Sequence, residues 1–422
     1  GTEATELNDF IYPGSTADGV AFGPWVANYP QMTGYYSDPG PFPSGVIFRN
    51  DVKRTDDQTG IFGELTWNMS DAFALTLGIR HYEIEVDLEG SANTSFCNSG
   101  AAADKNAYGT DISDLYDGDG QFTYISSCNT DNHITYTSSS VDGDTPSAVV
   151  GALQAPDVAK AKGNIGKASL AYTPNDDVLL YLTWSEGFRP GLLNRPGGAS
   201  GPDGYTVPFA LKTDTVTNVE LGWKVNLLDN SMRFNGSWFE VDIDDLQTTI
   251  FDPSIVNLFF SDNAANAEIS GLEGDILWNA TDRLALSGAF SFLKTEITDV
   301  LTPTSDVRQG DQLAFAPSFQ GNLKARYGWT SNSGLEMHVM PYLTHSGRSQ
   351  SDVIIINRVR LESWTMLGLT AGVGRDNWSA EVFADNLTNE KAQLAGTFVY
   401  DRNRLSYARP MTVGLRLSLD FN

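Results

Sequence analysis

The last fourteen residues, RPMTVGLRLSLDFN, restrict this chain more than any other feature of its sequence. From Thr412 onward the odd positions are apolar or aromatic, and the even positions are small or polar. A period of two places all the apolar side chains on one face of a β-strand. The same alternation returns in 219–225, 284–292, 319–327 and 335–339. The chain is therefore predicted to be all-β, built from strands with one apolar face.

The connections between these strands indicate what the apolar face touches. Short polar turns and long connections rich in Gly, Asp, Asn and Ser alternate strictly along the chain. The short turns fall at 68–71, 173–177, 227–231, 279–283, 330–334 and 374–377, and the long connections at 88–162, 190–212, 247–263, 297–314, 346–358 and 388–404. A soluble sandwich has no reason to place every tight turn at one end, whereas outer-membrane barrels have short periplasmic turns and long external loops. The sequence therefore predicts a transmembrane antiparallel β-barrel.

Aromatic residues close to the short turns fit this prediction, because barrels carry aromatic girdles at the membrane interfaces. The residues concerned are Trp67, Tyr172, Trp278, Tyr327 and Trp378. The alternation also assigns faces. We predict that Leu284, Leu286, Phe290, Leu323, Leu415, Leu417 and Phe421 face lipid, and that Glu220, Lys224, Asn322, Lys324 and Arg416 face the lumen.

One strand breaks the regular pattern. Its apolar positions are odd from Phe73 to Ile79 and even at Tyr82, Ile84 and Val86. An extra residue in one strand would produce such a change of face. A β-bulge near His81 is therefore predicted.

Composition excludes several classes of protein. The net charge is −26, from 53 acidic and 27 basic residues, whereas a nucleic-acid surface needs clustered Lys and Arg. The sequence contains no run of about eighteen apolar residues, which is the length that a membrane-spanning helix needs. The N-terminus, GTEATELNDF, shows no basic and then apolar secretion signal, so a signal was removed or the chain is not the start of its gene product.

Five segments together resemble the C-terminal part of TonB-dependent outer-membrane receptors. They are YLTWSEGFRPGLLN (181–194), VELGWK (219–224), ISGLEGDILW (269–278), FADNLTNE (383–390) and the terminal RPMTVGLRLSLDF. The resemblance covers about residues 55–422. In that family a barrel of twenty-two strands encloses a plug domain. We expect about thirteen of these strands in 55–422 and an extracellular loop in 1–54. The plug and about nine strands are then absent from this chain.

The resemblance implies a function in nutrient uptake. Such receptors lie in the outer membrane of Gram-negative bacteria and bind a scarce nutrient, such as a ferric siderophore, cobalamin or an oligosaccharide. The expected partners are the missing strands and plug, supplied by the same precursor or another chain, the TonB complex acting through that part, outer-membrane lipid and a small-molecule ligand. No nucleic acid and no catalysis are expected. A passive porin and an outer-membrane barrel enzyme are the alternatives, although the four histidines have no partner set that indicates catalysis.

Candidate ligand contacts lie in the loops and at the rim. Arg189, in the GFRPG segment, ends a strand and is either a structural residue of the barrel rim or a ligand contact. The aromatic residues Trp25, Tyr35 and Tyr36 could stack on a sugar ring or on an aromatic chelator. Exposed loops of any kind carry such residues, so these assignments are hypotheses.

The longest connection holds two further candidates. Asp111, Asp114, Asp117 and Asp119 are spaced like the oxygen ligands of a calcium loop, but the bidentate Glu is missing because position 128 is Cys. A solvated acidic loop is the alternative, and no other cofactor is expected. Cys97 and Cys128 are the only cysteines. A disulfide is predicted, since this surface is reached through an oxidising compartment, and two unpaired cysteines are the alternative.

Overall fold

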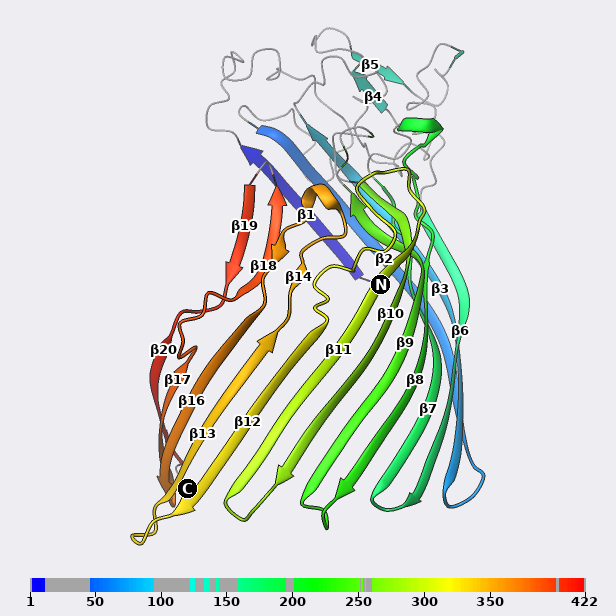
Figure 1. Ribbon diagram of the computed structural model, residues 1–422. Helices are drawn as coiled ribbons and strands as arrows, with labels where there is room; N and C mark the ends of the chain where they lie inside the picture. Colours follow the sequence, from blue (N-terminus) through cyan, green and yellow to red (C-terminus); the bar gives the residue numbers. More distant parts are fainter. Residues whose placement is uncertain are drawn as a thin grey trace.

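The computed structural model describes residues 2–11, 46–94, 122–125, 133–136, 142–143, 158–194, 201–250, 252, 255, 260–399 and 402–420. Fourteen antiparallel strands form one tilted, curved sheet, and their order in the sheet is their order along the chain (Figure 1). The strands are β1 Thr2–Ile11, β2 Val46–Asn68, β3 Phe73–Thr94, β6 Val158–Asn175, β7 Val178–Arg189, β8 Asp214–Leu227, β9 Met232–Ile250, β10 Phe260–Asn279, β11 Leu284–Val300, β12 Phe319–Thr330, β13 Glu336–Ser346, β16 Trp364–Arg375, β17 Trp378–Asp385 and β20 Thr412–Leu419.

The long connections carry the smaller elements, at the end of the sheet opposite the short turns (Figure 1). Their described residues form three hairpins and two 3-10 helices: β4 Phe122–Ile125 with β5 His133–Tyr136, β14 Ser349–Gln350 with β15 Arg360–Leu361, β18 Gln393–Val399 with β19 Arg402–Tyr407, η3 Pro202–Gly204 and η4 Ile355–Asn357. The described residues contain no helix long and apolar enough to span a membrane. The predicted all-β sheet with short turns at one end is confirmed.

The first strand corrects the predicted strand count. The thirteen sheet strands from β2 to β20 match the prediction, but β1 adds a fourteenth inside the range 1–54 that was predicted to be a loop. Strand β1 pairs with β2 from Thr2 opposite Asp56 to Ile11 opposite Val46. Its sequence, TEATELNDFI, has no period of two, so its pairing with β2 cannot be read from an apolar stripe.

The sheet is open. Strand β1 ends it on one side and β20 on the other. Among the described residues, β20 pairs only with β17, and the segment 57–68 of β2 pairs only with β3. Both edges therefore present unpaired backbone N–H and C=O groups.

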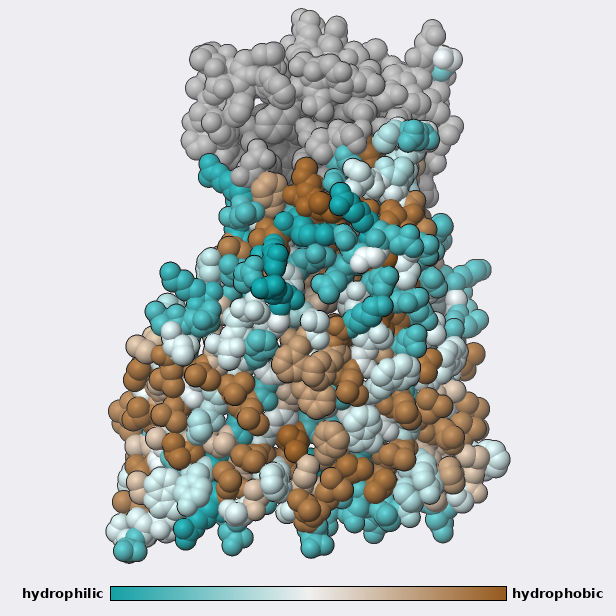
Figure 2. Space-filling view, viewed as in Figure 1, coloured by the Kyte–Doolittle hydropathy of each residue, from teal (hydrophilic) through white to brown (hydrophobic). Residues whose placement is uncertain are grey.

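The register confirms the predicted faces for the described residues. Leu286 pairs with Ala325, Gly288 with Leu323 and Val382 with Leu415, all on the outer face. Lys224, Asn322 and Arg416 lie on the opposite, inner face, whereas Phe421 lies outside the described residues. Figure 2 shows the apolar side chains gathered over the half of the sheet nearer the short turns. The girdle residues are on this outer face, where Phe73 stacks on Tyr172 at 4.5 Å between ring centroids.

The predicted bulge at His81 is wrong. The ladders of β3 with β2 and with β6 run without a register shift through His81, which faces Ile61 on one side and Asn164 on the other. Beyond His81, toward the long connections, the apolar residues of β3 lie on the inner face because the segment that contains Leu193 covers them there. Tyr82, Ile84 and Val86 are buried in one cluster with Leu193, and the Tyr82 ring stacks on Phe188 at 3.6 Å.

A second core lies among the long connections. Side chains from 205–207, from β9 and β10, and from 297–314 and 353–354 enclose it, and Ile250, Phe260, Ile297 and Ile354 are almost completely buried. Burial of this apolar surface fixes the connections against one another. The rim of the sheet is consequently a built structure with defined positions for its polar groups.

Candidate functional site: a cavity on the inner face of the sheet

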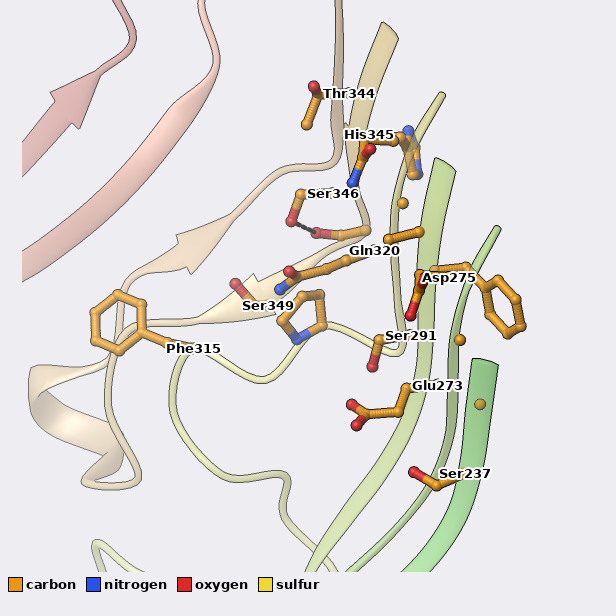
Figure 3. A pocket seen from close by; sticks show the side chains of 18 of the residues that line it. Ser237, Glu273, Asp275, Ser291, Phe315, Gln320, Thr344, His345, Ser346 and Ser349 are labelled. Carbon is orange, nitrogen blue, oxygen red and sulfur yellow. Dashed lines mark hydrogen bonds between the residues drawn. The ribbon is translucent and has the colours of Figure 1, made fainter. Parts of the chain in front are cut away.

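A cavity of about 660 Å³ opens on the inner face of the sheet (Figure 3). Strands β7 to β13 form its wall. Residues 315–317, the β14–β15 hairpin, the start of β16 and part of β18 lie over it. This volume lies within the range of small-molecule sites, about 300 to 1,000 Å³. The cavity is therefore large enough to hold a ligand.

Two rows of inward-pointing side chains build the polar wall. In the first row Ser237 pairs with Glu273, which pairs with Ser291, which pairs with Gln320. In the second row, two residues closer to the short turns, the corresponding positions are Asn235, Asp275, Ala289 and Asn322. Figure 3 shows Ser237, Glu273 and Ser291 projecting from neighbouring strands into the cavity. The period of two and the ladder register thus gather side chains that lie far apart in sequence.

Hydrogen bonds fix part of this wall. The Tyr181 hydroxyl donates to Glu220 at 2.5 Å. Its ring lies over Gly222, where a Cβ atom would come within 2.1 Å of it, so only glycine permits this contact. The Asn235 amide donates to Asp275 at 3.2 Å. Glu220 and Asp275 are thereby held in place.

The charge of the cavity is negative. Glu220, Glu273 and Asp275 line it together with Lys224. A fourth carboxylate, Glu362, lies 3.2 Å from the guanidinium groups of Arg348 and Arg360 and is neutralised by them. The side chains of Glu273 and Lys224, which both line the cavity, make no hydrogen bond or ion pair within the described residues, so both can meet a ligand.

The covering segments contribute apolar surface. Phe315, Pro317, Leu361, Trp364 and Leu394 line this side. Phe315 has a φ of 53°, an uncommon conformation for a bulky residue that surrounding contacts must hold. Its backbone N–H donates to the carbonyl of Gln350 in β14 at 2.7 Å, and half of the residue remains exposed. The covering segment thus holds an exposed aromatic ring beside the cavity.

Arg189 lies at the rim in a network that joins β7, β8 and β9. Its Nε and Nη2 atoms donate to Asp214 Oδ2 at 2.9 and 2.5 Å, and Nη2 also donates to the Gln247 carbonyl at 2.8 Å. The Gln247 amide donates to the carbonyls of Pro190 and Lys212 at 3.0 Å. These bonds give Arg189 a structural role, and its role as a ligand contact stays a prediction.

The other predicted site residues lie outside the described residues. They are Trp25, Tyr35, Tyr36, Asp111, Asp114, Asp117, Asp119, Cys97 and Cys128. The aromatic contacts, the calcium loop and the disulfide therefore stay predictions. Within the part of the chain that the structure describes, no group of three or more His, Cys, Asp or Glu residues could hold a metal ion.

Of the predicted lumen residues, Glu220, Lys224 and Asn322 line the cavity. Sequence reasoning missed Glu273 and Asp275, although they alternate with Leu272, Gly274 and Ile276. That alternation was the available signal for their face. It could not show which residues of neighbouring strands would share a row with them.

The loop core contains a carboxyl group with a shifted pKa. Burial, and then the nearby Asp252 carboxylate, raise the pKa of Asp306. The protonated form is favoured by folding, so this group's contribution to stability is present at low pH and is lost as the pH rises through the raised pKa. The Asp306→Asn variant is therefore expected to protect the peptide 297–310 from hydrogen exchange more than the native chain does at neutral pH. The difference should shrink as the pH falls.

A matched control is Asp203→Asn, which changes an exposed loop carboxylate for which no such repulsion is expected. It should leave exchange in 297–310 unchanged at every pH. A faster exchange in Asp306→Asn at neutral pH would contradict the assigned repulsion between Asp306 and Asp252.

The chain is similar in sequence to a known family and in structure to solved outer-membrane proteins. The family model described as "TonB dependent receptor-like, beta-barrel" matches residues 4–387. The ferric yersiniabactin uptake receptor FyuA of Yersinia pestis superposes with a TM-score of 0.64 at 14% identity, over 90% of this chain and 48% of that chain. The ferric-catecholate import receptor Fiu of E. coli K12 gives a TM-score of 0.58 at 16% identity, over 99% and 50%. The copper transporter OprC gives a TM-score of 0.56 at 14% identity, over 93% of this chain and 53% of that chain.

These similarities show the fold of this chain. At such low identities the ligands of these proteins do not transfer to this chain. The chain spans about half the length of each of the three structures.

Proposed function

Because the chain belongs to the TonB-dependent receptor-like β-barrel family, we propose that it forms part of the wall of a receptor for the TonB-dependent, energy-coupled uptake of a scarce nutrient. The family confirms the resemblance found in the five sequence segments, and it places the chain in the outer membrane of a Gram-negative bacterium. The observation that carries the proposal is the open fourteen-stranded sheet, with an apolar outer face and a polar cavity on its inner face.

The two edges of the sheet support a role for additional strands. In hydrocarbon every unpaired backbone group costs several kcal/mol, so a sheet spans the membrane only as a closed barrel. We propose that further strands pair with β20 and with 57–68 of β2, and that a plug domain fills the lumen on the side of the short turns, so that the cavity stays open toward the long connections. The TonB complex would act on that plug, and the wall described here would contribute the external rim and the cavity.

The nutrient class remains part of the proposal. A ferric siderophore, cobalamin and an oligosaccharide are the candidates, and each would enter from the side of the long connections. A passive porin is the second candidate function because the inner face is polar and charged. The family weighs against an enzyme, and we propose that the nutrient is bound and moved without chemical change.

Uptake in cells tests the proposal. The full-length receptor is produced in an outer-membrane host that lacks it, with and without TonB, and accumulation of labelled ferric siderophores, cobalamin and oligosaccharides is measured. We expect at least one solute to accumulate only when both the receptor and TonB are present. Accumulation that persists without TonB would identify a porin, and so would a large steady conductance of the purified protein in planar bilayers.

A further inference from the structure

We propose that the inner-face cavity binds an uncharged, hydroxyl-rich solute of the saccharide class and rejects polyanionic ligands. This inference rests on the uptake function proposed above and names the class of nutrient. Three properties of the cavity lead to it: its charge, the hydrogen-bonding capacity of its wall and the aromatic side chains of the covering segments.

The charge disfavours anions. Among the described residues that line the cavity, Lys224 is the only Lys or Arg, and it shares the wall with the carboxylates of Glu220, Glu273 and Asp275. Recognition of an anionic chelate or a phosphate uses clustered arginine and lysine donors. Like charges inside a cleft with low-dielectric walls repel more strongly than they do in open water. A polyanion is therefore expected to bind here poorly.

Two carboxylates of the wall are left largely unsatisfied by the donors of the wall itself. Ionised carboxylates only accept, Glu273 receives no hydrogen bond within the described residues, and Asp275 receives only the long bonds from Asn235. The neighbouring Ser237, Ser291 and Gln320 can both donate and accept. A ligand that fits must supply several donors at short intervals, and vicinal hydroxyl groups do so without adding charge.

The aromatic surface completes the arrangement. Phe315 and Trp364, both from the covering segments, line the cavity, and Figure 3 shows Phe315 on the side away from Glu273 and Ser291. A pyranose ring has an apolar C–H face and a polar hydroxyl edge, so it can pack on an aromatic ring while its edge meets carboxylates and amides. The strained backbone of Phe315 is consistent with a ring that is held in position before a ligand arrives.

Binding measurements on the full-length receptor test this inference. Labelled receptor is applied to an array of neutral and sulfated glycans, and quenching of tryptophan fluorescence by a ferric tris-catecholate is measured in parallel. We expect binding to neutral glycans, with little binding to sulfated glycans or to the ferric chelate. Glu273→Gln should weaken neutral-glycan binding about tenfold, the effect of losing one charge-assisted hydrogen bond. Glu273→Lys should also increase binding to sulfated glycans.

The matched control is Glu83→Gln, which removes a carboxylate from the outer face of the sheet, where Glu83 lies 3.6 Å from His81. It should leave every binding constant unchanged. Tighter binding of the ferric chelate or of sulfated glycans overturns the inference, and so does the absence of neutral-glycan binding. An organic cation that displaces the neutral glycans and binds more tightly would overturn it as well.

The two proposals fail separately. A receptor that takes up a ferric chelate in a TonB-dependent manner retains the proposed function and loses this ligand class. A protein that binds neutral glycans but transports them without TonB retains the ligand class and loses the proposed function.

Discussion

Replacing Leu323 with arginine is expected to destabilise the receptor by about 2 to 4 kcal/mol, the cost of a cationic side chain on the lipid face near the middle of the membrane. Leu323 lies on the outer face of β12, next to Gly288 of β11 and Leu343 of β13, and is 47% exposed on the protein surface. That exposed area meets hydrocarbon in a membrane, so an arginine there would lose its hydration.

The depth of Leu323 follows from its distance to the aromatic girdle. It lies four positions from Tyr327, a residue of the interface. Four residues of a strand tilted near 45° rise about 10 Å, and the apolar band is about 25 Å tall, so Leu323 lies close to its midpoint. Leu417 is a weaker test because it lies only two residues from Leu419, which pairs with the interfacial Trp378.

Urea unfolding of the full-length receptor in lipid vesicles measures this effect. The matched control is Asn322→Arg, one residue away on the inner face, where water and the polar wall surround the new charge. We expect it to change the free energy of unfolding by less than about 1 kcal/mol, as typical for substitutions that remain solvated. Equal losses in both variants would show that the faces are assigned incorrectly.

Much of the fold could be predicted because one physical rule relates sequence to position here. The period of two assigns each side chain to a face, and a membrane permits only one face to be apolar. Leu286, Leu323 and Leu415 were therefore placed correctly from their neighbours alone. The short turns between these strands fixed the end of the sheet in the same way.

The change of face at His81 shows the limit of that rule. It holds only within the apolar band, because beyond the band either face can be covered by protein. Leu193 lies more than one hundred positions along the chain from Tyr82, and its contribution to the same core could not be read from the alternation around His81. A bulge would have explained the change of face from local sequence alone, but the cause is the contact of Tyr82 with residues far along the chain.

Strand β1 was missed for a related reason. Its residues do not alternate, and it pairs with the part of β2 on the side of the long connections. Backbone hydrogen bonds to an existing edge stabilise such a strand, and these bonds carry no side-chain pattern.

Prediction of the cavity needs both the alternation along each strand and the register between strands. The alternation places Glu273 on the inner face, but its row partners Ser237 and Gln320 depend on the register of three ladders. That register is set by the lengths of the connections that join the strands and by any bulge between a connection and the cavity, and the ladder of β10 with β11 runs without a shift from its short turn to the cavity rows. A sequence alone does not give these offsets.

Removing the carboxylate of Asp214 is expected to cause the second large loss of stability. The same experiment distinguishes the structural role of Arg189 at the rim from its role as a ligand contact. The Asp214 side chain is only 4% exposed, and it accepts two bonds from Arg189 and one from the backbone N–H of Gln247. Asp214→Ala leaves these donors without an acceptor. Breaking a fully buried pair costs about 3 to 5 kcal/mol, but water reaches the half-exposed Arg189, so we expect about 2 to 3 kcal/mol.

The loss should be local, so hydrogen exchange in 189–194 and 245–250 is the suitable measurement. Asp214→Asn retains an acceptor and should lose less than Asp214→Ala. The double variant Arg189→Met with Asp214→Ala should recover part of the loss, because the unpaired guanidinium is gone. If Arg189 acts only at the rim, Arg189→Met will raise exchange in these segments and leave ligand affinity unchanged. A fall in affinity without faster exchange would instead make Arg189 a ligand contact, because its positive charge would then act on the nutrient itself.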